Sequence, residues 1–82
     1  MTEIETEHRH LTMKVKDALR GGRTAWRCMS TGEKVAVALI LNKENWLKEI
    51  KYSMAEAIDR IGTAWISLVP RIEKELRDEG MI

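Results

Sequence analysis

Apolar residues recur at helical spacing along most of this chain. From Leu11 onward they fall three or four residues apart, which places them on one face of a helix. The members of this first stripe are Leu11, Val15, Ala18, Leu19, Gly22, Trp26 and Met29. The pattern predicts a helix that starts at Thr12 and is broken or kinked at Gly21 and Gly22, because two adjacent glycines cost about 2 kcal/mol in a helix interior.

A continuous apolar run follows at residues 35–41. It reads Val-Ala-Val-Ala-Leu-Ile-Leu and is apolar on every side, which predicts the central and most buried helix. Ser30 and Glu33 have the spacing of a capping box, which would start a helix just before the run. Valine and isoleucine also suit a strand, but no second strand is available to pair with it, so a helix is the preferred interpretation.

The second half of the chain repeats the helical spacing after a polar turn at Asn42–Asn45. Its apolar members are Trp46, Ile50, Met54, Ala57, Ile58 and Ile61. One long helix would explain them, but Ser53 and Glu56 form a second capping box, which favours a break just before Ser53. Gly62 is placed to end this helix as a C-terminal cap.

A last helix carries Trp65, Val69, Ile72 and Leu76 on one stripe. Pro70 is tolerated in its first turn if Ser67 is the N-terminal cap, because proline needs no backbone donor there. Gly80 is placed to end it.

Two segments of the chain resemble each other at a constant offset. Thr-Ala-Trp occurs at 24–26 and again at 63–65, and Ala18 corresponds to Ala57. A true duplication would give two pseudo-symmetric helix–turn–helix units, whereas chance similarity would still mark two helices that end near a buried tryptophan. We therefore predict an all-α fold, a compact bundle of four to five short helices.

The length and composition favour one small domain. The chain has 82 residues, of which 44% are hydrophobic and 33% charged, a globular profile. We expect a flexible N-terminal tail at 1–10, which is polar and lacks periodicity, and a single α-helical domain at 11–82. A core this small gives marginal stability, so a homodimer is plausible.

The same composition gives expectations about the compartment. Cys28 is the only cysteine, so no disulfide can form within the chain, and we expect it to fill a small buried space. Neither a signal-peptide pattern nor an apolar run long enough to cross a bilayer is present. We therefore expect a cytoplasmic protein without a membrane partner.

No residue pattern here predicts a catalytic or metal site. His8 and His10 lie two residues apart in the polar tail, and no other histidine or cysteine has the spacing of a zinc site. No glycine-rich phosphate loop is present, and Cys28 lacks an adjacent base. We expect no metal, no cofactor, no small-molecule substrate and no enzymatic activity.

Three tryptophans suggest an interaction surface. A bundle of this size would struggle to bury all of Trp26, Trp46 and Trp65, and tryptophan is a frequent interface anchor. The preferred hypothesis is a small non-enzymatic interaction or regulatory protein of the adaptor type. It would bind another protein, or a second copy of itself, through these three side chains. The opposing interpretation is that all three line the core.

Basic residues suggest an alternative function. Lys16, Arg20, Arg23 and Arg27 are spaced by four, three and four residues, so on a continuous helix they form one row. Such a row can contact phosphates, face an acidic partner or simply be solvated. The alternative is a small DNA-binding transcriptional regulator that uses the basic helix at 14–29. In the preferred hypothesis the same row is the polar rim of the protein interface.

Overall fold

Five helices and no strand make up residues 3–82, the part of the chain that the computed structural model describes. In chain order they are α1 (Glu3–Arg27), α2 (Thr31–Ile40), α3 (Glu44–Glu49), α4 (Met54–Ile66) and α5 (Leu68–Asp78). The predicted all-α bundle of four to five helices is confirmed.

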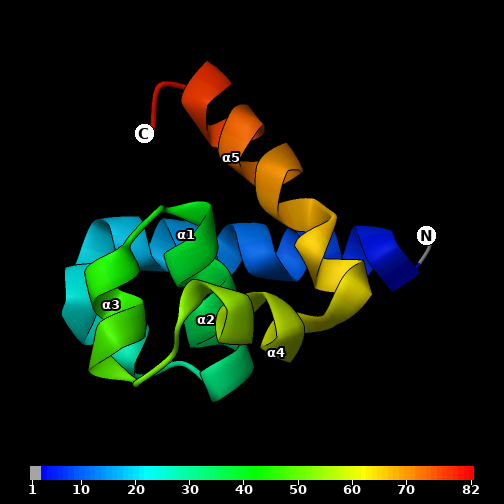
Figure 1. The fold of residues 1–82 in the computed structure, drawn as a ribbon. Helices are drawn as coiled ribbons and strands as arrows, with labels where there is room; N and C mark the ends of the chain where they lie inside the picture. The colour runs from blue at the N-terminus through cyan, green and yellow to red at the C-terminus, as the bar shows by residue number, and fades with distance from the viewer. Residues whose placement is uncertain (1–2) are drawn as a thin grey trace.

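α2 is the central element of the bundle. It contacts each of the other four helices, and Figure 1 shows it between α1 and α4. Half of its residues are buried, namely Val35, Ala36, Val37, Ala38 and Ile40. The apolar run is therefore the central helix, as predicted, because only a position enclosed by other helices buries an element that is apolar on all sides.

α1 begins much earlier than its apolar stripe. Residues 3–10 form its first turns, so the predicted tail at 1–10 and the predicted start at Thr12 are wrong for the described residues; residues 1 and 2 lie outside them. The Nε2 atom of His8 lies 2.6 Å from a carboxylate oxygen of Glu75 in α5, and that of His10 lies 2.6 Å from Glu33 in α2. The histidines expected in a solvated tail instead join α1 to two other helices.

Two glycines redirect the chain within helices. Gly22 in α1 has φ 66° and ψ −156°, and Gly62 in α4 has φ 77° and ψ 172°. This backbone region is essentially restricted to glycine, because a Cβ atom would clash there. The predicted break at Gly21–Gly22 is confirmed. Gly62 has the expected positive φ, but helical residues continue beyond it to Ile66.

The two similar segments do not have equivalent environments. Val15 is fully buried, whereas Met54, the matching residue, is 44% exposed. Trp26 is fully buried, whereas Trp65 is only partly buried. The glycine turn precedes Trp26 by four residues and Trp65 by three, so the two turns are not at equivalent positions. The sequence similarity therefore does not produce two matching units.

Both predicted capping boxes are present. The hydroxyl of Ser30 accepts from the Glu33 amide, and the Glu33 carboxylate accepts from the Ser30 amide. Ser53 and Glu56 make the same reciprocal pair at the start of α4. Ser67 also begins α5 as predicted, but its hydroxyl donates to the Ala64 carbonyl instead of capping the helix.

Three helices end with the same C-terminal motif. Asn42, Lys51 and Gly80 follow α2, α3 and α5, and each has a φ between 56° and 76°. After α5, the amide of Met81 donates to the Leu76 carbonyl, and the amide of Gly80 donates to the Arg77 carbonyl. The ends of α2 and α3 show the same bond pattern, which is that of a Schellman motif. These caps fix the short connections that bring α3 and α4 onto α2.

Replacement of Gly22 by alanine tests the redirected backbone of α1. Gly22→Ala should lower the free energy of unfolding by about 1–3 kcal/mol, because alanine is strained at this φ and ψ. Gly32→Ala is the matched control, since a Cβ atom there would have only ordinary contacts, the nearest 3.6 Å away. Urea unfolding gives the free energy of unfolding of both variants. Equal stability of Gly22→Ala and the wild-type protein would contradict the left-handed backbone conformation at Gly22.

Acid titration tests the two capping boxes. Burial alone would raise the pKa of Glu33, but hydrogen bonds from Ser30 and His10 and the charge of Lys14 outweigh it, so that the pKa is lowered from 4.5. Hydrogen bonds from Ser53 lower the pKa of Glu56 as well. A carboxylate with a lowered folded-state pKa stabilises the protein above its unfolded pKa, and that stabilisation is lost as the pH falls through the folded value.

The urea midpoint of the wild-type protein should therefore fall as the pH is lowered from about 5 to about 3. The drop should be smaller in Glu33→Gln/Glu56→Gln, which has no carboxylate to protonate at the caps. Glu7→Gln, which removes a carboxylate outside the caps, is the control. An equally steep drop in the double variant would show that the caps do not contribute to acid sensitivity.

Candidate interaction surfaces

Two of the three predicted tryptophan anchors lie in the core. Trp26 is fully buried, and its indole Nε1 donates to the Lys34 carbonyl oxygen at 2.8 Å. Trp46 of α3 is 8% exposed, and its ring centroid lies 4.9 Å from that of Trp26 with the planes tilted by 37°. The prediction that these two contact a partner is wrong for this fold. The small core accommodates both because each indole covers a face of the other.

Trp65 differs from the other two. It lies near the end of α4, is partly buried, and packs on the edge of the core. Of the three predicted anchors, it alone keeps a substantial part of its surface accessible.

The predicted basic stripe does not form one row. The turn at Gly22 separates Lys16 and Arg20 from Arg23 and Arg27, so 14–29 is not one straight basic helix. The first two cations are paired: Lys16 lies 4.0 Å from Glu79, the residue that follows α5, and Arg20 lies 2.6 Å from Asp17. The spacing argument failed because it required a continuous helix through two glycines.

Arg23 and Arg27 instead join a cluster built from three parts of the chain. Both face Glu49 of α3: Arg27 donates to its two carboxylate oxygens at 2.8 and 2.9 Å, and an Arg23 nitrogen lies at 3.6 Å. Lys34 of α2 lies 5.9 Å from the centroid of the Trp26 ring. Arg23 and Lys43 lie 5.9 and 6.0 Å from the centroid of the Trp46 ring. We name Arg23, Arg27, Lys34 and Lys43 the tryptophan–cation cluster.

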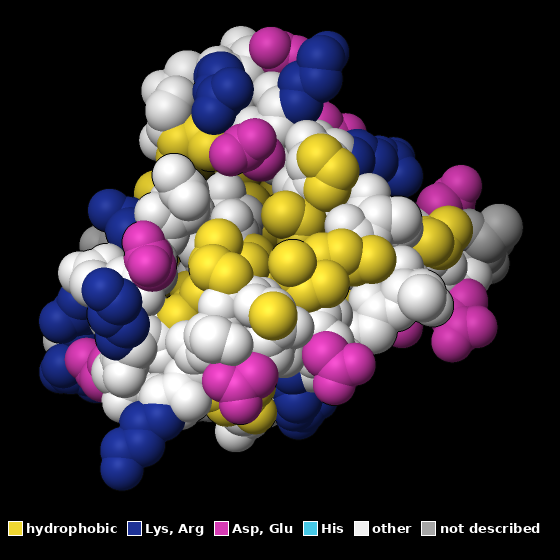
Figure 2. Space-filling model, in the orientation of Figure 1, with side chains coloured by type: hydrophobic (Ala, Val, Ile, Leu, Met, Phe, Trp, Pro, Cys, Tyr) yellow, Lys and Arg dark blue, Asp and Glu magenta, His cyan; other side chains and the backbone are white. Residues whose placement is uncertain are grey.

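Charge is strongly concentrated around this cluster. The hydrogen bond from Arg27 lowers the pKa of Glu49, burial opposes this, and the charges of Arg27, Arg23 and Lys34 lower it further. The same contact raises the pKa of Arg27. In Figure 2 several dark blue side chains lie on the left, over α3 and the end of α1, and others lie at the top over α5. Lys34 and Lys43 were not predicted as site residues, since only the folded topology brings them to the arginines.

An apolar surface lies on α4 and the start of α5. Met54 and Ile58 are 44% and 49% exposed, and Trp65, Ile66 and Val69 are partly buried. Figure 2 shows hydrophobic side chains gathered where these two helices meet. We call these five residues the α4 face. The sequence placed Met54 and Ile58 at helical spacing with Ala57 and Ile61, which are buried in the structure.

Two charged residues of opposite sign follow Ile58 on the same helix. Asp59 and Arg60 are both exposed, and within residues 3–82 neither forms an ion pair. Arg60 comes two residues after Ile58 and therefore lies on the opposite side of α4, where its guanidinium is close to Gly32 of α2. It is not part of the α4 face.

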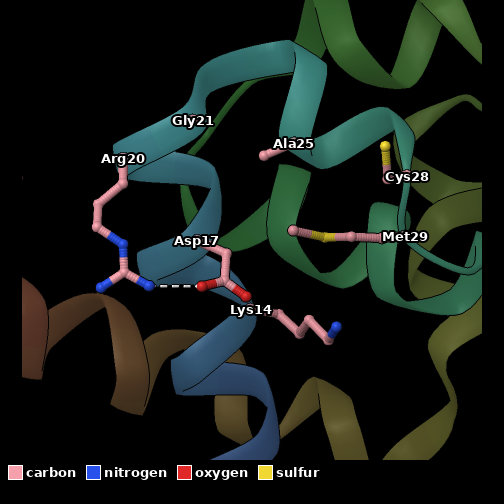
Figure 3. Close-up of a pocket in the computed structure, with 7 residues that line it drawn as sticks. All are labelled: Lys14, Asp17, Arg20, Gly21, Ala25, Cys28 and Met29. Atoms are coloured by element: carbon pink, nitrogen blue, oxygen red, sulfur yellow. Dashed lines mark hydrogen bonds and ion pairs between the residues drawn. The ribbon is translucent and has the colours of Figure 1, made fainter.

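An open hollow of about 480 Å³ lies beside the kink of α1. Figure 3 shows Arg20, hydrogen-bonded to Asp17, on one side of the hollow, and Cys28 and Met29 on the other side. Cys28 is exposed, so the prediction of a buried filler is wrong; its thiol contacts only the Thr24 carbonyl, at 3.5 Å. None of the side chains that line the hollow is a histidine.

Neither a membrane-spanning helix nor a metal-binding cluster is found in residues 3–82. None of the five helices has both the length and the apolar character needed to cross a bilayer. No group of three or more histidine, cysteine, aspartate or glutamate side chains in the described chain is arranged to hold a metal ion.

Comparison of the chain with protein-family models, with curated proteins and with solved structures finds no match in any of the three.

Proposed function

We propose that this chain is a small, non-enzymatic interaction protein that acts through the α4 face, and that its partner there is a second copy of the chain. The supporting observation is the exposure of Met54 and Ile58, one turn apart on α4, beside the partly buried Trp65. Exposed apolar side chains gathered in one place are typical of surfaces that bind other proteins. This keeps the hypothesis of a helical interaction surface but moves it from Trp26 and Trp46 to α4.

The α4 face also suits a symmetric contact. In a two-fold symmetric contact the same patch of each copy meets its counterpart, so the patch must be self-complementary. An apolar patch satisfies this requirement, because Met54 and Ile58 of one copy can pack on the same residues of the other.

Dimerisation would also compensate for the small core of this domain. A chain of 82 residues buries only about 60–65% of the surface that its unfolded form exposes, so the folded monomer is only marginally stable. Association of folded chains adds buried apolar area and stabilises the folded state by mass action. The dimer would leave the tryptophan–cation clusters of both copies on its surface.

Sedimentation velocity over a dilution series tests this proposal. The wild-type protein should show a reversible monomer–dimer equilibrium. Met54→Gln/Ile58→Gln should weaken it at least tenfold. Four partly exposed apolar side chains, two from each copy, would lose contacts of about 1 kcal/mol each, and 1.4 kcal/mol corresponds to a factor of ten.

The matched control replaces Met13 and Leu19, two exposed apolar residues of α1 outside the α4 face. Met13→Gln/Leu19→Gln should dimerise as the wild-type protein does. A wild-type protein that remains monomeric up to about 1 mM, where even a free energy of association of about −4 kcal/mol would be detected, would refute the proposal. So would equal weakening by the two double variants.

A further inference from the structure

We infer that the tryptophan–cation cluster binds the phosphate backbone of nucleic acid. The inference concerns a surface distinct from the α4 face and does not depend on the proposed pairing of two copies. It also differs from the sequence hypothesis of a basic helix at 14–29, because two of its four cations come from outside α1.

The cluster is held in place by the core. Arg23 and Lys43 lie against the Trp46 ring, and Lys34 lies against the Trp26 ring. The two rings pack on each other, so these three cations, from α1, α2 and the α2–α3 connection, share one base, and Arg27 is held beside them by Glu49. Cation–π contacts of this kind restrain the long side chains before a ligand arrives, which reduces the entropy lost on binding.

The cluster has more positive charge than its own contacts neutralise. Glu49 is the carboxylate that its arginines contact, and Lys34 and Lys43 form no ion pair in the described chain. Lys51, just after α3, is likewise exposed and without an ion pair. At the opposite end of the molecule α1 begins with Glu3, Glu5 and Glu7, and Figure 2 shows magenta side chains there. A chain of net charge +1 thus has one basic end, which would orient a polyanion.

The local geometry matches a phosphate ligand. Arg27 binds the Glu49 carboxylate through two parallel hydrogen bonds, the arrangement with which arginine also binds phosphate. Glu49 therefore occupies a position that suits an anionic oxygen pair, and its own charge opposes an incoming phosphate. Removal of this charge should strengthen binding, whereas removal of the lysines should weaken it.

The surface favours nucleic acid over a lipid membrane. Amphipathic membrane-binding surfaces insert exposed apolar side chains next to their cations. None of the strongly exposed large apolar residues of the described chain belongs to the cluster, and the two indoles are covered. Because no ring is free to stack on a base, the contact would be with the backbone and would not depend on base sequence.

Fluorescence anisotropy with a labelled mixed-sequence DNA duplex at about 50 mM salt tests the inference. Lys34→Gln/Lys43→Gln should weaken binding by about tenfold or more and reduce the slope of log K against log salt by roughly 2, since each lost phosphate contact changes it by about 0.9. Glu49→Gln should bind more tightly than the wild-type protein. The two variants thus shift affinity in opposite directions, which a general loss of folding would not produce.

The control is Arg9→Gln/Lys74→Gln, which removes the same charge from exposed sites outside the cluster. It should change the DNA affinity less than threefold. Met54→Gln/Ile58→Gln should retain DNA binding, so that failure of the proposed dimer and failure of this inference remain distinguishable.

Three results would overturn the inference. One is a wild-type protein that does not bind the duplex at low salt. Another is equal weakening by the cluster variant and its control. The third is binding of vesicles that contain phosphatidylserine under conditions in which the duplex is not bound, which would assign the cluster to a membrane surface.

Discussion

The burial of Trp26 against α2 is the interaction on which the rest of this structure depends. The indole has no exposed surface, its one donor is satisfied by the Lys34 carbonyl, and its ring packs on Trp46. Through these contacts one side chain of α1 fixes the positions of both α2 and α3. An indole that lost its acceptor would leave a buried donor unpaired, which typically costs about 1–3 kcal/mol. The glycine turn at Gly22 is what allows the chain to direct Trp26 there.

The same interaction determines which surfaces are left for function. Because Trp26 and Trp46 are turned inward, the cations beside them face outward and lie together, although they are distant in sequence. Trp65, after its own glycine turn, reaches only the edge of the core and leaves α4 partly uncovered. The protein therefore has a basic surface at one end and an apolar surface on α4, and these two surfaces carry our two proposals.

Local patterns were sufficient to predict most of the fold. The capping boxes at Ser30 and Ser53, the central apolar helix and the break at Gly21–Gly22 depend on neighbouring residues, and all are present. The helical start of α1 was missed because it is held by polar contacts of His8 and His10 with residues far along the chain. A search for apolar periodicity cannot detect such contacts.

The candidate surfaces were predicted less well, for related reasons. The basic stripe assumed one straight helix, and the Gly22 turn kept only Arg23 and Arg27 together. The burial of two tryptophans depends on their stacking, which is a contact between α1 and α3. Residue counts could show that the core is small but not which indole it would leave at the edge. Trp65 was among the predicted anchors, whereas Met54 and Ile58 were predicted only as members of an apolar stripe at helical spacing.

The central claim is that Trp26 and Trp46 build the core while Trp65 belongs to the interacting surface. The most direct test is a dilution series of the ¹⁵N-labelled protein by NMR, in which the three indole N–H signals are followed. The account predicts that the Trp65 signal shifts with protein concentration while the Trp26 and Trp46 signals stay in place. Concentration-dependent shifts of the Trp26 or Trp46 signal, with the Trp65 signal unchanged, would contradict it.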